Sequence, residues 1–187
     1  MTPSDSAAPS NQEAEKATLS GAELLSSRDQ FALAEYNNLR AEINNMIGMQ
    51  AQLIGLVVIS FGAIVSVGFQ TRNPAIITVH PILVLILGIR WIDYSHAVVR
   101  AASYIREHIE AHFLGGSNQG WEHFFLGYEY PRSGVGYLGV SAIFPGSSVV
   151  AVFSAAYIGS LNFSSIAAIA TGTLITAATI FLFILYK

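Results

Sequence analysis

The chain contains no cysteine among its 187 residues, which excludes disulfides, thiolate zinc sites and cysteine nucleophiles. Charge is scarce as well. Asp, Glu, Lys and Arg make up 11% of the residues, whereas 52% are hydrophobic. Soluble domains carry about 25% charged residues on average. The composition therefore predicts a protein whose partner is the lipid bilayer.

The sequence also lacks the motifs of common enzymes and nucleic-acid binders. No glycine-rich phosphate loop follows a strand, no Gly-x-Ser-x-Gly turn is present, and no pair of carboxylates lies in a cleft-forming pattern. The formal net charge is −3, without a basic patch. We therefore expect no enzymatic activity, no cofactor and no nucleic-acid partner.

Four long apolar stretches are present, and they decide the fold class. They run over Met49–Phe69, Ala75–Ile92, Tyr137–Ile158 and Ser165–Tyr186. About 20 apolar residues in a helix cross the hydrocarbon core of a bilayer, and the second stretch is short but sufficient. The sequence predicts an all-α membrane protein with four transmembrane helices arranged as two hairpins.

Four regions follow from this assignment. They are a disordered polar tail (1–28), a first transmembrane hairpin with a helical stalk (29–113), an aromatic interfacial segment (114–136) and a second transmembrane hairpin (137–187). The tail is predicted from its Ser, Ala, Pro, Gln and Glu content, since such a segment has little apolar surface to bury.

The basic residues predict the orientation of the spans. Of nine Lys and Arg residues, only Arg72 lies in the connection between the first two stretches, and none lies between the last two. Basic residues concentrate on the cytoplasmic side of membrane proteins. We therefore expect a multi-pass protein of the cell membrane with both termini in the cytoplasm.

Helical periodicity continues past both cytoplasmic ends of the first hairpin. Apolar residues alternate by three and four over 32–46 and again over 91–109, which is typical of paired helices. A turn centred near Arg72 sets their register. We expect two continuous helices that run antiparallel into the cytoplasm as a stalk.

Aromatic residues indicate a shorter helix at the membrane surface. Trp121, Phe124, Phe125 and Tyr128 share one helical face, as in interfacial helices. The alternative is that this face packs against the base of the stalk. Arg90 and Trp91 close the second span, where they are expected at the headgroups.

Small residues recur along three of the four spans and predict close helix packing. They are Gly48, Gly55 and Gly62 in the first span, Ser147, Ala151, Ala155 and Gly159 in the third, and Ala168, Gly172 and Thr176 in the fourth. Packing within one chain is favoured over packing between copies, which would make a homo-oligomer. Pro145, followed by Gly146, predicts a bend in the third span.

Few polar residues inside the spans are candidates for function. Gln50, Gln52 and His80 are the candidates for a polar path, although the glutamines also fit a headgroup boundary. Pro81, next to His80, predicts either a kink or the first turn of a helix. His108 and His112 are one helical turn apart, but two imidazoles without a third ligand do not predict a metal site.

Three short runs resemble small four-span bacterial integral membrane proteins that have no established catalytic residues: Tyr36–Ile43, Tyr104–Glu110 (YIREHIE) and 120–122 (Gly-Trp-Glu). Our first functional hypothesis is a non-enzymatic, oligomeric membrane module, a leak, channel or effector-like protein. Its stalk would receive a cytoplasmic protein partner or a signal. A small transporter subunit and a passive scaffold that recruits a soluble partner are the alternatives.

Overall fold

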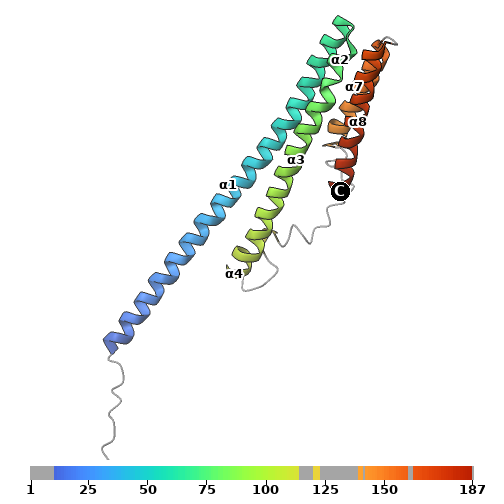
Figure 1. The fold of residues 1–187 in the computed structure, drawn as a ribbon. Coiled ribbons are helices and arrows are strands. Elements are labelled where there is room, and N and C mark those ends of the chain that lie inside the picture. The colour runs from blue at the N-terminus through green and yellow to red at the C-terminus, as the bar shows by residue number, and fades with distance from the viewer. Residues whose placement is uncertain (1–10, 114–119, 123–138, 141, 160–161, 187) are drawn as a thin grey trace, which may run out of the picture. The chain divides into compact units, whose positions relative to one another are not determined.

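The computed structural model describes residues 11–113, 120–122, 139–140, 142–159 and 162–186, and all of its regular elements are helical (Figure 1). No strand occurs in these residues. The helices are α1 (Asn11–Thr71), α2 (Pro74–Ile77), α3 (Val79–Tyr104), η1 (Ile105–Glu110), α4 (Ala111–Phe113), η2 (Ala142–Gly146), α7 (Ser147–Ile158) and α8 (Phe163–Tyr186). The elements η1 and η2 are π-helical turns.

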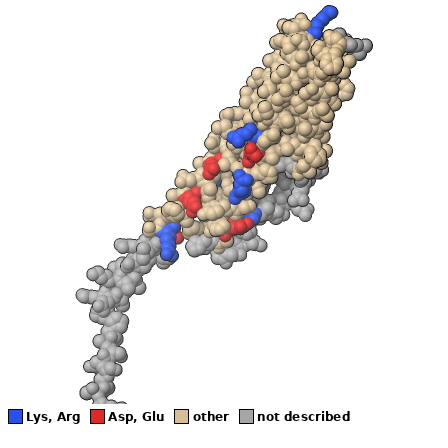
Figure 2. Space-filling view, viewed as in Figure 1, with Lys and Arg blue, Asp and Glu red and all other residues tan. Residues whose placement is uncertain are grey.

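Three helices are long and apolar enough to cross a membrane: Ser27–Thr71, Pro74–Glu110 and Phe163–Leu185. The third predicted span corresponds to a shorter apolar helix over Ala142–Ile158. This finding indicates a membrane protein. Figure 2 shows the apolar end of the molecule as an almost uninterrupted tan surface on the side in view, with basic atoms at its tip.

The chain divides into two compact units, 1–41 and 42–187. In the first unit, α1 begins at Asn11, inside the range for which the composition predicted a disordered tail. Residues 11–28 contain Ala, Glu, Lys, Leu and Gln, which favour helix, and the tail prediction overlooked that propensity. Further along, the Nε–H of Arg40 donates to the Tyr36 hydroxyl at 3.2 Å, and the guanidinium lies over the Tyr36 ring.

In the second unit, a tight turn separates α1 from α2. Arg72 has φ 51°, and its neighbour Asn73 caps α2 by accepting the Ala75 N–H at 3.1 Å. Pro74 takes the first position of α2, where its missing N–H has no helical partner to lose. The turn brings Ile77 against Gly68 so closely that a Cβ on Gly68 would overlap Ile77 Cγ1.

The start of α3 resolves the two interpretations of Pro81. Thr78 interrupts the helix, and α3 begins at Val79, so Pro81 lies in its first turn. Proline is tolerated there because first-turn N–H groups are unpaired in any helix. Pro145 is different, because it lies inside η2, and the wider π turn takes the place of regular α-helix where the sequence predicted a bend.

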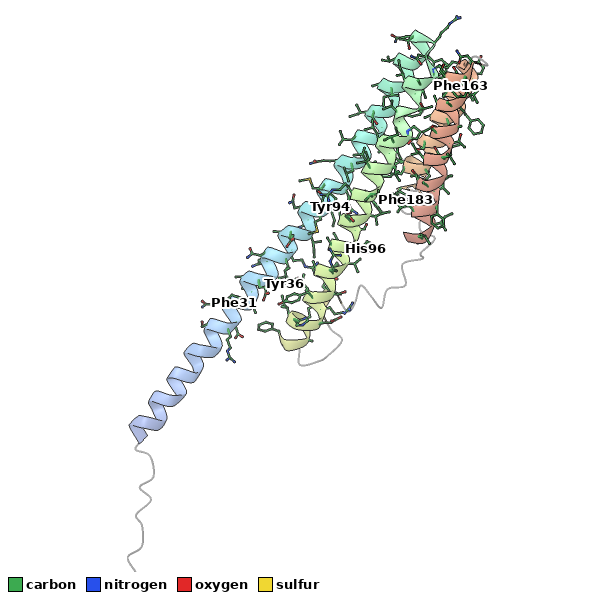
Figure 3. The ribbon with its side chains drawn as sticks, in the orientation of Figure 1. Phe31, Tyr36, Tyr94, His96, Phe163 and Phe183 are labelled. Atoms are coloured by element: carbon green, nitrogen blue, oxygen red, sulfur yellow. The ribbon has the colours of Figure 1, made fainter. Side chains whose placement is uncertain are left out.

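Two buried clusters form the core of the second unit. The first contains Val57, Val84, Phe144 and Phe183, and the second contains Ile77, Ala151 and Ala155. They bring together α1, α3, η2 and α8 in one case, and α2 and α7 in the other. At the start of α8, by contrast, Phe163 is exposed (Figure 3).

Candidate functional site

An aromatic cluster surrounds the one glycine of α3. A Cβ on Gly88 would lie 3.0 Å from Phe183 and 3.5 Å from Phe144. These two rings are stacked at a centroid distance of 5.4 Å, and Trp91 lies 6.3 Å from Phe183. Gly88 therefore lets α3 approach η2 and α8. This cluster could not be predicted from the sequence, because Gly88, Phe144 and Phe183 share no repeat with the small-residue patterns.

Trp91 belongs to this cluster as well as to the end of the second span. Its ring packs against Phe144 and Phe183, and only part of its surface is accessible. The position of Trp91 at the headgroups stays a prediction, and the structure adds that its indole packs against rings from two other helical elements. Neighbouring Arg90 is exposed, as an interfacial residue would be.

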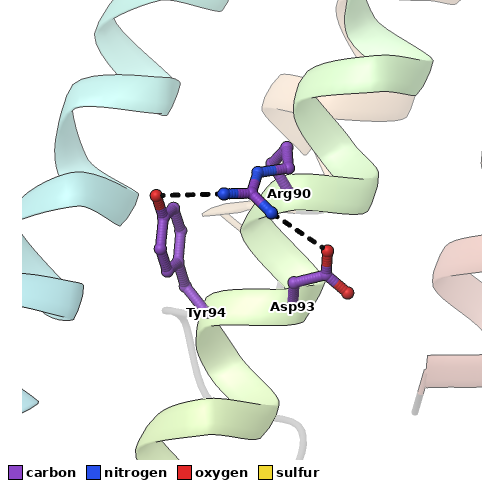
Figure 4. A network of polar contacts seen from close by, with 3 residues as sticks. All are labelled: Arg90, Asp93 and Tyr94. Atoms are coloured by element: carbon purple, nitrogen blue, oxygen red, sulfur yellow. Dashed lines mark hydrogen bonds and ion pairs between the residues drawn. The ribbon is translucent and has the colours of Figure 1, made fainter.

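Arg90 is the centre of a local polar network on α3 (Figure 4). Its guanidinium lies 3.6 Å from the Asp93 carboxylate, and it donates to the Tyr94 hydroxyl at 3.5 Å. The guanidinium also lies over the Tyr94 ring, 5.2 Å from its centroid. Asp93 and Tyr94 each lie about one helical turn after Arg90 on the same helix, so the network anchors Arg90 without fixing any second helix.

Gln50 provides a polar contact between α1 and α3. Its amide donates to the Trp91 carbonyl at 3.2 Å and to Ser95 Oγ at 2.7 Å. This pairing agrees with the antiparallel register that a turn at Arg72 predicts. Gln50 is thus engaged with α3, whereas Gln52 is exposed and His80 is fully buried. The structure does not bring the three candidates for a polar path together.

His80 lies where α1, α3 and α7 meet. Its Nε2 is 3.1 Å from Ser147 Oγ, and its ring meets Phe61 edge-on at 5.3 Å. Ser147 also donates to the Phe144 carbonyl at 3.1 Å. His80 Nδ1 and Ser148 Oγ are buried and have no hydrogen-bond partner in the described part of the chain.

The glycines fall into two groups. A Cβ on Gly48, Gly55 or Gly62 would meet nothing within 4 Å. In contrast, Gly172 lies against Thr78 and Val152, and Gly159 against Ile169. The expectation that the glycine stripe of the first span packs within the chain is therefore wrong for the described residues, because α1 turns its other side toward the core.

Helices α7 and α8 contribute several of their small residues to the interior. Ala151 and Ala155 are fully buried, and Ser147 and Gly159 are partly exposed. On α8, Gly172 and Thr176 are buried and Ala168 is partly exposed. Thr176 donates to the Gly172 carbonyl at 2.8 Å, so its hydroxyl is satisfied within its own helix.

A buried carboxylate lies close to the end of the helical extension of α3. Glu110, the last residue of η1, accepts the Glu122 N–H with both oxygens, at 3.1 and 3.2 Å. Gly120 lies so close that a Cβ there would overlap the Glu110 carboxylate. We name Glu110, Gly120 and Glu122 the carboxylate latch. It joins two of the three runs on which the resemblance to four-span proteins rests.

The remaining candidates are placed only in part. His108 is exposed and stacks on Tyr104 at 4.6 Å, whereas the His112 side chain lies outside the described residues. Within the described ranges, no three His, Cys, Asp or Glu residues gather to hold a metal ion. Trp121 is 58% exposed. The rest of the predicted interfacial helix, Phe124, Phe125 and Tyr128, also lies outside those ranges.

Comparison of the chain with protein-family models, curated proteins and solved structures finds no match.

Proposed function

We propose that the chain is a non-enzymatic, oligomeric membrane module that forms a leak or channel and receives a cytoplasmic partner or signal through its helical extension. The observation that carries this proposal is the open face of α1. A Cβ on Gly48, Gly55 or Gly62 of this face would meet nothing within 4 Å, whereas Gly68, Gly88, Gly159 and Gly172 are closely packed.

The open face also carries larger and polar residues. Successive steps of three and four place Gln52, Ile59 and Ser66 between and beyond the glycines, and all three are exposed. Successive helical residues are rotated by about 100°, so this face of α1 lies opposite the side that carries buried Val57. Small residues let helix backbones approach closely, and polar side chains hydrogen-bond between helices in lipid. A second copy of the chain is the occupant that such a face suits.

The carboxylate latch supports the proposal that a partner or signal acts at the far end of the helical extension from the Gly88 cluster. α3 and η1 are contiguous from Val79 to Glu110, so one helical rod connects the Gly88 cluster to the latch. A partner that displaces the segment held by Glu110 would act on this rod. The π turn of η1 is a suitable place for such a response, since π turns are often found at functional positions.

The proposed topology is four spans in the cell membrane, with both termini and the extension in the cytoplasm. The distribution of Lys and Arg supports it, because Arg72 is the only basic residue in either connection on the opposite side. The short turn at Arg72 leaves little room there for a binding domain. The input therefore belongs on the cytoplasmic side.

Cross-linking tests the interface directly, because the natural chain is free of cysteine. We expect an Ile59→Cys variant to form a disulfide between two copies when the protein in liposomes is oxidised. Leu174→Cys is the matched control, since Leu174 on α8 is 72% exposed and Ile59 is 70% exposed. Dimer formation is expected at position 59 and not at 174, as read on a non-reducing gel.

Ion flux from the same liposomes tests the output. Vesicles that contain the natural chain should lose a potassium or proton gradient faster than empty vesicles, and Gly55→Leu should abolish the difference by blocking close approach of α1 helices. Vesicles that keep the gradient as long as empty vesicles would contradict the proposed leak. Equal cross-linking at positions 59 and 174 would contradict the proposed interface between copies.

A further inference from the structure

The protonation pattern of His80 follows from the hydrogen bonds of Ser147. A serine hydroxyl has one hydrogen to donate. Ser147 directs it to the Phe144 carbonyl at 3.1 Å, so its Oγ is left to accept from His80 Nε2, also at 3.1 Å. We therefore assign the neutral His80 ring as the tautomer with hydrogen on Nε2. Its Nδ1 is then an acceptor.

No hydrogen-bond donor among the described residues reaches His80 Nδ1. His80 is fully buried, and Nδ1 is one of the buried atoms without a partner. Ser148, next to Ser147 in the first turn of α7, is also fully buried, and its Oγ is without a partner as well. A buried polar group without a hydrogen-bond partner destabilises the fold. Both groups border Ser147, His80 through its hydrogen bond and Ser148 as the next residue of α7, and together they point to a ligand.

The chemistry of the surroundings selects that ligand. His80 is the only ionisable side chain other than tyrosine in 43–71, 73–89, 142–159 and 162–186, so no carboxylate from α1, α2, α7 or α8 faces it in these ranges. A metal ion would find one imidazole and no anionic ligand, and a bound cation would have no counter-charge. A neutral molecule with both donors and acceptors suits an imidazole nitrogen and a hydroxyl.

We propose that His80 Nδ1 and Ser148 Oγ bind water inside the helical bundle. Water donates to Nδ1 and exchanges hydrogen bonds with the hydroxyl, which satisfies both groups without bringing charge into the bundle. Such a water would lie inside the bundle, where α1, α3 and α7 meet. This proposal rests on the membrane placement in the proposed function. The binding itself requires neither a leak nor an oligomer.

Solid-state NMR of the full chain in phospholipid liposomes tests this directly, with the histidines labelled with ¹⁵N. The chain has five histidines, and the His80→Phe variant assigns the His80 signals by their loss. We expect the tautomer with hydrogen on Nε2 and magnetisation transfer from water to the His80 ring. Exposed His96 serves as the positive control for water contact.

Ser148→Ala is the decisive variant, because it removes one of the two groups and leaves the His80–Ser147 bond in place. The transfer from water to His80 should fall by about half, since a buried water needs two to four polar partners. The tautomer should not change. A ring with hydrogen on Nδ1, or no transfer to His80 while His96 shows it, overturns the water site. Either result leaves the flux experiment as a separate test of function.

Discussion

A Gly68→Ala variant is expected to lose about 2 kcal/mol of folding stability, as overpacking of a close contact does. The added Cβ would overlap Ile77 Cγ1 and would lie 2.8 Å from Ile77 Cδ1. Ile77 is fully buried, and the Asn73 N–H donates to the Gly68 carbonyl at 3.1 Å. Neither the side chain nor the turn has room to move. Unfolding by SDS in mixed micelles measures the loss.

The matched control is Gly48→Ala, also in α1. Within one chain a Cβ at Gly48 would meet nothing within 4 Å, so alanine should leave the folding stability of the single chain unchanged or raise it through its helix propensity. Ile77→Ala provides a rescue, because it removes both atoms in the clash. The double variant should be more stable than the sum of the single effects predicts. Strict additivity would contradict the proposed contact.

The second large effect is expected at Phe144, which is fully buried between Trp91 and Phe183. Phe144→Ala should cost roughly 3 kcal/mol, the low end of the range for buried Phe→Ala changes. The low end applies because lipid gives little hydrophobic drive, so the cost is the lost packing around the cavity. The same SDS unfolding measurement detects it.

Phe153→Ala is the control for Phe144→Ala. It makes the same chemical change on α7, but Phe153 is 72% exposed and loses little packing within the chain. We expect its unfolding to match that of the natural chain. Equal losses for the two variants would mean that the aromatic cluster does not hold the bundle together.

Helix type and approximate position were predictable because apolar runs of membrane length carry a strong pattern. The turn at Arg72 illustrates this, since α1 ends at Thr71 and α2 begins at Pro74. The bonds from Gln50 to Trp91 and Ser95 agree with the register expected from this turn, although the bonds themselves were not predicted. The start of α1 was not predicted, because a polar composition lowers apolar burial without lowering helix propensity.

The close contacts of the bundle were less accessible to sequence reasoning. Spaced glycines indicate that helices approach, but not which helix or which copy. Gly55 belongs to a regular stripe and is open, whereas Gly88 belongs to none and is packed by Phe183. The carboxylate latch was likewise hidden, because Glu110 and Gly120 are ten positions apart and their contact depends on the tertiary fold.

Labelling of single cysteines in intact cells tests most directly whether the apolar bundle lies in the membrane with its charged extension in the cytoplasm. Gln70 near the turn and His96 on the extension are both exposed, and the natural chain has no cysteine to interfere. A membrane-impermeant maleimide should label Gln70→Cys in intact cells, and His96→Cys only after permeabilisation. Labelling of His96→Cys in intact cells, or of neither variant before permeabilisation, would contradict the account.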